Sequence, residues 1–161
     1  MNGKKNGKGV EYDRLSDIKY VGEFLNGKKN GKIKEYAAEG YFYNIYDSEK
    51  PNLIFEGEYS NGKRNGNGKE YNEEGKLIFE GEYLDGKKWK GIEKEYDEDT
   101  EKLIFECEYK NGERNGEIKE YDKYNGELLF SGTYLNGKKN GKGEEYIFSM
   151  KKVVNQVIIY I

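Results

Sequence analysis

Aromatic residues and glycines alternate with glutamates in short runs that recur along the chain. From Phe55 to Tyr59, aromatic or glycine positions alternate with glutamate, a period of two that is typical of a β-strand. Asn61 and Gly62 follow at once, and this dipeptide favours a two-residue type I′ turn, because both of its central residues need positive φ. Two spaced glycines then open a second run, which ends at Tyr71. The stretch therefore predicts one β-hairpin.

Nearly the same sequence recurs along the chain and predicts about six copies of this hairpin. The turn glycines lie 24 to 26 residues apart, except for one interval of 35 residues. The long interval marks an insertion at residues 37–52, and the first copy lacks its first strand. The copies span residues 2–12, 20–36, 55–71, 79–96, 105–121 and 130–146.

Each copy supplies two strands, so the repeats predict an antiparallel meander of about eleven to thirteen strands. Repeats of this kind contact only their neighbours. We therefore expect an all-β fold, an elongated single-layer antiparallel β-meander or solenoid of stacked hairpins. We expect a single domain over residues 1–150. The apolar tail at 151–161 is interpreted first as a last strand that caps the sheet, then as a docked helix or a partner-binding segment.

The spacing leaves one question about the two faces of the sheet. A regular hairpin around Asn61 and Gly62 would put Tyr71 on the face opposite Phe55 and Tyr59. Two solutions fit the sequence: aromatic side chains on both faces, or a bulge near the spaced glycines that reverses the alternation. We favour the bulge, because one aromatic face is easier to shield from water than two.

Composition narrows the chemistry that the chain can perform. The hydrophobic share of 34% and the charged share of 37% would favour disorder, but 16 Tyr and 7 Phe at repeated positions indicate an aromatic core. One Cys and no His exclude a disulfide within the chain and a Cys/His zinc site. Cys107 stands at a repeat-glycine position and is expected to be a small buried side chain. No signal peptide or membrane span is recognised, so we expect a cytoplasmic protein.

Basic residues follow almost every turn glycine. Eleven of the twelve residues directly after these glycines are basic, although the net charge of the chain is −3. Aligned hairpin tips would form a cationic ridge, either a solvated edge that resists aggregation or a surface for an anionic partner. Nucleic acid is not expected, because the rest of the chain is acidic. The ridge residues are Lys28, Lys29, Lys63, Arg64, Lys87, Lys88, Arg114, Lys138 and Lys139.

The aromatic positions form a second candidate surface, which packs the repeats together or holds a partner peptide. Its residues are Phe55, Tyr59, Phe79, Tyr83, Phe105, Tyr109, Phe130 and Tyr134. The glutamates that recur in every copy are expected to pair across strands with lysines such as Lys69 and Lys94. They recur too regularly to be a catalytic pair. We therefore expect no catalytic, cofactor or metal site, and a non-enzymatic protein.

The repeated text resembles the MORN family, the membrane occupation and recognition nexus repeats. The family pattern is an aromatic residue, a glycine two residues on, a second aromatic residue and then spaced glycines. The Lys-Glu-Tyr endings are also similar to variant MORN repeats of some bacterial proteins. Cys107 replaces the glycine in one copy, and another copy carries an extra residue near Trp89. The pattern is carried by Tyr20-Gly22-Phe24, Phe55-Gly57-Tyr59, Phe79-Gly81-Tyr83, Phe105-Cys107-Tyr109 and Phe130-Gly132-Tyr134.

The resemblance implies scaffolding, membrane association and dimerisation. Our first hypothesis is a scaffold or adaptor that binds proteins. The second is a peripheral membrane module that binds anionic lipid through the ridge, and the third is an antitoxin-like partner of a bacterial toxin. A protein partner and a homodimer are both compatible with these readings, and no cofactor is expected.

Overall fold

The computed structural model describes residues 3–37, 52–147 and 152–159, in which all regular structure is β-strand. The chain forms two units, residues 1–87 and 88–161, which are described separately. The insertion predicted at residues 37–52 lies outside the described residues, apart from its two ends. The all-β class and the stacked hairpins predicted from the sequence are confirmed.

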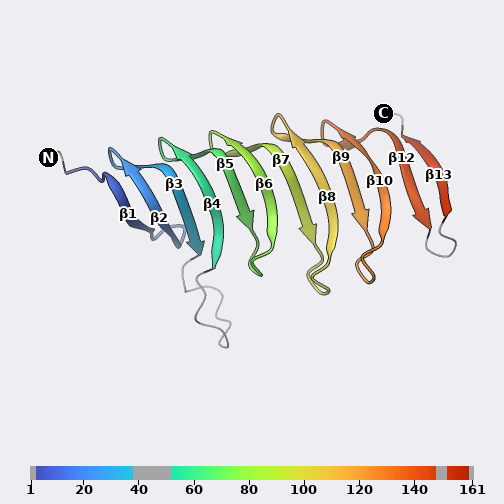
Figure 1. Ribbon diagram of the computed structural model, residues 1–161, viewed down its shortest axis with the longest axis horizontal. Coiled ribbons are helices and arrows are strands. Elements are labelled where there is room, and N and C mark those ends of the chain that lie inside the picture. Colours follow the sequence, from blue (N-terminus) through green and yellow to red (C-terminus); the bar gives the residue numbers. More distant parts are fainter. Residues whose placement is uncertain (1–2, 38–51, 148–151, 160–161) are drawn as a thin grey trace. The chain divides into compact units, whose positions relative to one another are not determined.

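Unit 1 is one antiparallel sheet in which each strand pairs with the next one in the chain (Figure 1). Short turns at both ends of the strands make this order possible, because antiparallel neighbours need only a two-residue connection. The strands are β1 (Gly7–Asp13), β2 (Ile18–Leu25), β3 (Lys28–Ala37), β4 (Leu53–Ser60), β5 (Lys63–Tyr71) and β6 (Leu77–Leu84).

Unit 2 repeats this arrangement from β7, which begins at the last residue of unit 1. Its apolar tail forms a strand that pairs with β12, at the place where the sequence predicted a last strand. The strands are β7 (Lys87–Tyr96), β8 (Leu103–Lys110), β9 (Glu113–Tyr121), β10 (Leu128–Leu135), β11 (Lys138–Lys139), β12 (Gly141–Ile147) and β13 (Lys152–Ile159).

The hairpin turns have the predicted type I′ geometry. Asn61 and Gly62 have φ angles of 52° and 88°, and Asn26 and Gly27 have 52° and 86°. Both central residues are therefore left-handed, which asparagine and glycine tolerate best. Each tip is also tied to its neighbour, since the Gly62 N–H donates to a carbonyl of the preceding hairpin at 2.8 Å.

The predicted bulge is present, but it does not place all aromatic side chains on one face. Tyr59 pairs with Arg64 and Gly57 pairs with Gly68, so three residues of β5 lie opposite Glu58. A slip of two residues preserves the alternation of faces. The Tyr71 hydroxyl accordingly donates to Glu56, a neighbour of Phe55 in sequence, on the face opposite Phe55. The preference for a single aromatic face was wrong.

The core of unit 1 consists of aromatic rings laid over bare glycine backbone. Phe55 is fully buried, and a Cβ atom built on Gly57 or Gly68 would lie 2.7 Å or 2.6 Å from its ring. The ring also meets Tyr83 edge to face, with 5.2 Å between centroids. The paired glycines therefore leave the space that the phenylalanine ring fills, and the sheet needs no second layer to bury it.

Cys107 in unit 2 takes the place of such a glycine and is fully buried opposite Ile118. This confirms the sequence-based expectation of a small buried side chain. Burial raises the pKa of the Cys107 thiol to about 11, because the thiolate would lose its hydration.

We predict that Cys107 reacts slowly with thiol reagents in the folded protein. Only a small fraction of the thiol is ionised at neutral pH and the sulfur is covered, so native labelling should be much slower than labelling of the unfolded chain at the same pH. Timed alkylation followed by mass spectrometry measures this, with urea-unfolded protein as the control. Native and unfolded protein labelled at equal rates would contradict the prediction.

Candidate functional site

One row of residues crosses unit 1 from strand to strand and is almost entirely glycine. Pairing across the strands joins these positions one after another, so they lie side by side in six consecutive strands. The single side chain in the row, Ile33, is buried on the aromatic face. On the opposite face the row therefore exposes only backbone. Its members are Gly9, Gly22, Ile33, Gly57, Gly68 and Gly81.

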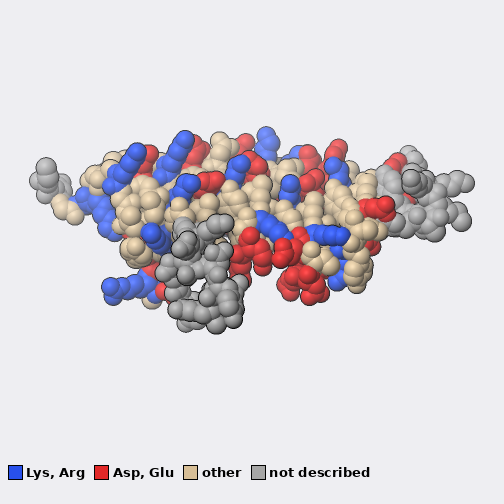
Figure 2. All heavy atoms as spheres, turned by 60° about the horizontal axis from the view of Figure 1, so that its bottom comes forward, with Lys and Arg blue, Asp and Glu red and all other residues tan. Residues whose placement is uncertain are grey.

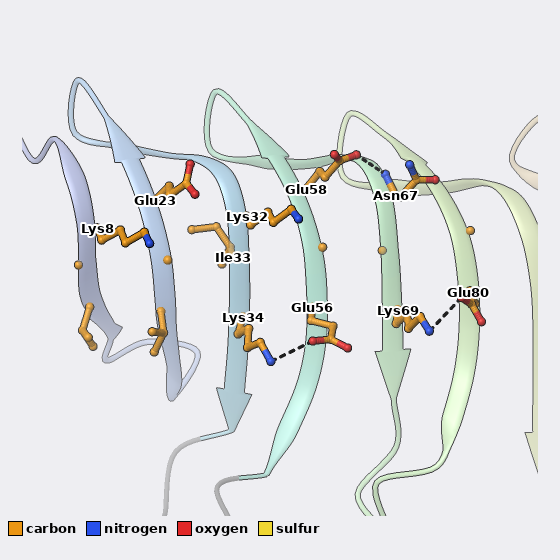
Figure 3. Close-up of a pocket in the computed structure, with 17 residues that line it drawn as sticks. Lys8, Glu23, Lys32, Ile33, Lys34, Glu56, Glu58, Asn67, Lys69 and Glu80 are labelled. Atoms are coloured by element: carbon orange, nitrogen blue, oxygen red, sulfur yellow. Dashed lines mark hydrogen bonds and ion pairs between the residues drawn. The ribbon is translucent and has the colours of Figure 1, made fainter.

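This bare row forms the floor of a groove of about 1110 Å³ on the face opposite the core. Side chains from the positions on either side of the row form its two walls (Figure 3). Four lysines and four glutamates line the groove, so its charges balance. Val10 and Val21 add an apolar end, at which Val10 is 51% exposed. The charged lining residues are Lys8, Glu23, Lys32, Lys34, Glu56, Glu58, Lys69 and Glu80.

Ion pairs and one backbone hydrogen bond hold the walls in place. Lys34 contacts Glu56 at 3.1 Å and Lys69 contacts Glu80 at 3.0 Å, along one wall. Hydrogen bonds from Lys34 and then from Tyr71 hold the pKa of Glu56 below its usual value, so this carboxylate is charged at neutral pH. On the other wall the Glu58 carboxylate accepts the Asn67 backbone N–H at 2.7 Å and closes the bulge.

Unit 2 carries a smaller hollow of about 440 Å³ at the corresponding row. Ile118, Gly132 and Gly143 lie on its floor, with Lys119 and Glu144 among the residues on its wall. Cys107 and Glu93 stand at two of the glycine positions here, but their side chains lie on the aromatic face, so the two sites differ mainly in size. The larger groove of unit 1 is therefore the better candidate for a binding site.

The structure divides the predicted cationic ridge into two sets. In the turns at Gly27, Gly62, Gly86 and Gly137 the first basic residue is exposed at the tip, whereas the second folds back over the aromatic face, as Arg114 does in the turn at Gly112. Lys29 lies 3.3 Å from the Tyr20 ring centre, and Lys139 contacts Glu120 at 2.6 Å. The exposed set is Lys28, Lys63, Lys87 and Lys138, and the folded-back set is Lys29, Arg64, Lys88, Arg114 and Lys139.

Arg64 belongs to a buried polar network that the sequence did not predict. Its guanidinium donates to Glu35 at 2.8 and 2.9 Å and to Glu70 at 3.0 Å, and it lies 4.0 Å from the Phe55 ring centre. The Tyr59 hydroxyl donates to Glu35 at 2.5 Å. Burial and this hydrogen bond raise the pKa of Tyr59. Burial alone would lower the pKa of Arg64, but its hydrogen bonds to the two carboxylates raise it.

Arg114 repeats this arrangement in unit 2, where it contacts Glu93 at 2.6 Å and also Glu95. Lys69 and Lys94 pair with glutamates across strands as expected, but their partners are Glu80 and Glu106, and not the glutamates directly before the second aromatic residue or the final tyrosine of each copy. A basic residue after each turn glycine was a visible signal. No comparable signal in the sequence indicated the glutamate partner in a neighbouring repeat, because that contact depends on how the hairpins stack.

The aromatic positions proposed as a partner surface are mostly interior. Phe55, Tyr59, Phe79, Tyr83, Phe105 and Phe130 are buried, while Tyr109 and Tyr134 are half-buried. Basic side chains from the turns lie over these rings, as Arg114 does at 4.8 Å from the Phe105 ring centre. This face therefore offers a partner little open aromatic area, and the geometry favours the opposite face.

The described residues hold no group of three or more His, Cys, Asp or Glu side chains that could bind a metal ion. Nor do they contain a helix that could cross a membrane. In Figure 2 basic and acidic side chains lie next to one another along the upper part of the view, and acidic side chains gather at its lower edge.

Comparison with known families identifies the repeats. The MORN repeat model matches residues 1–14, 20–32, 55–75 and 130–147, and these segments are MORN repeats. The match omits the two copies around Trp89 and Cys107, which depart most from the pattern, and it ends directly before Ile33. Among curated proteins no match was found. MORN repeats are generally associated with scaffolds that bind proteins or membrane lipids.

Proposed function

We propose that this MORN-repeat chain is a non-enzymatic scaffold that binds a segment of a partner protein along the groove of unit 1. The observation that supports this most is the bare floor of the groove. A polypeptide backbone or a flat side chain can lie directly on the backbone of this row, because the side-chain positions of the row point to the aromatic face.

The walls indicate what kind of partner fits. Four lysines and four glutamates face the groove, so a polyanion such as nucleic acid or a row of lipid headgroups would meet as many repulsive as attractive charges. A polypeptide with residues of both signs can instead pair with both walls. The two valines at one end, of which Val10 is exposed, favour an apolar anchor at that end of the bound segment.

Filling the groove tests this proposal. Lys32 and Asn67 project their side chains from the wall and pack into no core, so Lys32→Trp with Asn67→Trp should leave the fold intact. We expect this variant to lose most of the partner protein that the native chain retains from its own cell extract. Quantitative mass spectrometry of the retained proteins measures the loss.

The matched control carries tryptophan at two exposed tips, through Lys28→Trp and Lys63→Trp. It should retain the same partner as the native chain, because these side chains lie outside the groove. If the two variants lose the same partner to the same extent, the groove does not bind it. If the groove variant retains it fully, the proposal is wrong.

A second candidate function is binding of an anionic membrane through the hairpin tips. Leu25 and Leu84, which are 52% and 44% exposed, each precede a turn whose other side carries an exposed lysine. Leu25 pairs directly with Lys28. An apolar side chain next to a lysine suits the interface between lipid headgroups and acyl chains.

We predict that changing Lys28, Lys63 and Lys87 to glutamate abolishes sedimentation with acidic vesicles at low salt. Each lysine near an anionic membrane contributes about 1 kcal/mol to the free energy of binding, so losing three of them is sufficient to abolish weak binding. Arg64 and Lys88 stay unchanged, because their ion pairs support the fold. Neutral vesicles are the control, and equal sedimentation with acidic and neutral vesicles at low salt would rule out this function.

A further inference from the structure

Strand β1 lies at the edge of the sheet, and no strand of the described residues lies on its outer side. On that side β1 nevertheless keeps the backbone geometry of an inner strand. It is the second strand of a hairpin, equivalent to β5, yet it pairs only with β2. Gly7 corresponds to the bulge glycine Gly66, and both have positive φ, 82° and 105°. The open side of β1 can therefore be compared residue by residue with the side of β5 that β4 occupies.

The first difference is the carboxylate that closes the bulge. In the complete hairpin, Glu58 of β4 accepts the Asn67 N–H at 2.7 Å. In unit 2 the corresponding Glu108 accepts the Glu117 N–H at 3.1 Å. Lys8 stands at the Asn67 position, and no strand of the described residues lies beside it to supply a carboxylate. The open edge thus presents a backbone donor suited to an acidic side chain.

The second difference is the space above the glycine row. Gly68 lies between the rings of Phe55 and Tyr83, at 2.6 Å and 3.2 Å from the position of a Cβ atom. Gly9 meets only the Phe24 ring, at 3.7 Å. Lys5, which corresponds to Arg64, is 58% exposed and paired with Glu11, whereas Arg64 covers the Phe55 ring. Gly9 and Lys5 therefore leave open the place where the first aromatic ring of the other hairpins lies.

We infer that the open edge of β1 binds an extended segment of another polypeptide that completes the first hairpin. The segment carries an aromatic residue, a glycine two positions on, an acidic residue next and then a second aromatic residue. The first ring covers Gly9 beneath Lys5, the glycine faces Gly9 as Gly57 faces Gly68, and the carboxylate accepts the Lys8 N–H. This is strand addition at a sheet edge, with backbone hydrogen bonds for affinity and side chains for specificity.

A second copy of the chain is a poorer source of this strand. Its own strands with the pattern, such as β2 and β4, already pair on both sides. A copy would have to open one of its hairpins to supply one. Binding at β1 does not depend on the proposed groove function, because the segment pairs with the strand edge, although Lys8 and Val10 of β1 also line one end of the groove.

A labelled peptide with the β4 sequence Leu53–Ser60 tests the inference through fluorescence anisotropy with the full chain. We expect saturable binding and slower amide hydrogen exchange in β1. A scrambled peptide, one with valine in place of its glycine, and one with lysine in place of the glutamate that follows it should each bind at least about tenfold more weakly. Tenfold corresponds to about 1.4 kcal/mol.

Variants of the protein separate the edge from the groove. Lys8→Pro removes the outward N–H and should weaken binding at least about tenfold. Lys32→Trp with Asn67→Trp fills the groove and should leave peptide affinity unchanged. Circular dichroism verifies that each variant is folded, and the peptide series remains decisive if Lys8→Pro is not. Equal binding of the scrambled peptide, or no binding at about 1 mM peptide, would overturn the inference.

Discussion

Replacing Arg64 with alanine is expected to lower the free energy of unfolding by about 3–5 kcal/mol, the cost of removing one partner from a buried ion pair. The Glu35 side chain is 3% exposed, and Arg64 supplies two of its three hydrogen bonds. Without the guanidinium, its carboxylate would remain buried with only the Tyr59 hydroxyl. Urea titration followed by circular dichroism measures the change.

Two further variants show whether the loss of stability comes from the Glu35 carboxylate that is left buried without its partner. Arg114→Ala should cost less, because Arg114 is 33% exposed and its partner Glu95 is 46% exposed. Arg64→Met combined with Glu35→Leu should recover most of the stability, since apolar residues of similar volume can replace a buried pair. A loss below about 1 kcal/mol for Arg64→Ala would contradict a structural role for this network.

The sequence predicted the hairpins well because their signals are local. The Asn61-Gly62 turn depends on backbone preferences of the two residues themselves, and the structure gives both of them positive φ. The faces were harder to predict. The bulge at Gly66 was anticipated, but spacing alone does not tell whether two or three residues lie opposite Glu58, and only the former would have brought Tyr71 to the core face.

The candidate site was less predictable, because it depends on register between repeats. The glycine row joins residues from six strands, and Ile33 breaks its pattern in the sequence without filling the groove. The predicted cationic ridge does not form one uniform surface, for a similar reason. Lys63 and Arg64 are adjacent, but alternation along the strand sends them to opposite faces. Arg64 contacts Glu35 of β3 and Glu70 of its own strand, whereas Lys63 stays exposed and contacts Asp85 in a turn.

Replacing Phe55 with alanine is expected to destabilise the protein by about 3–5 kcal/mol, the usual cost of deleting a buried phenylalanine ring. The ring is fully buried, and the glycine backbone beneath it has no side chain to refill the space. Gly68→Ile alone should cost about 1–3 kcal/mol, because its Cβ atom would lie 2.6 Å from the ring.

The two changes together should cost less than the sum of their separate effects, by about 0.5–3 kcal/mol. Isoleucine at position 68 can enter the space that the ring leaves, and isoleucine is already buried at the equivalent positions 33 and 118, where each is 1% exposed. Urea titration of both single variants and of the double variant measures this coupling.

Gly132→Ile is the matched control, because its Cβ atom would meet Phe130 and not Phe55. Combined with Phe55→Ala, its effect should be additive within about 0.5 kcal/mol, whereas combined with Phe130→Ala it should show the same coupling as the first pair. Additive effects for Phe55→Ala with Gly68→Ile would mean that ring and glycine do not compete for one space.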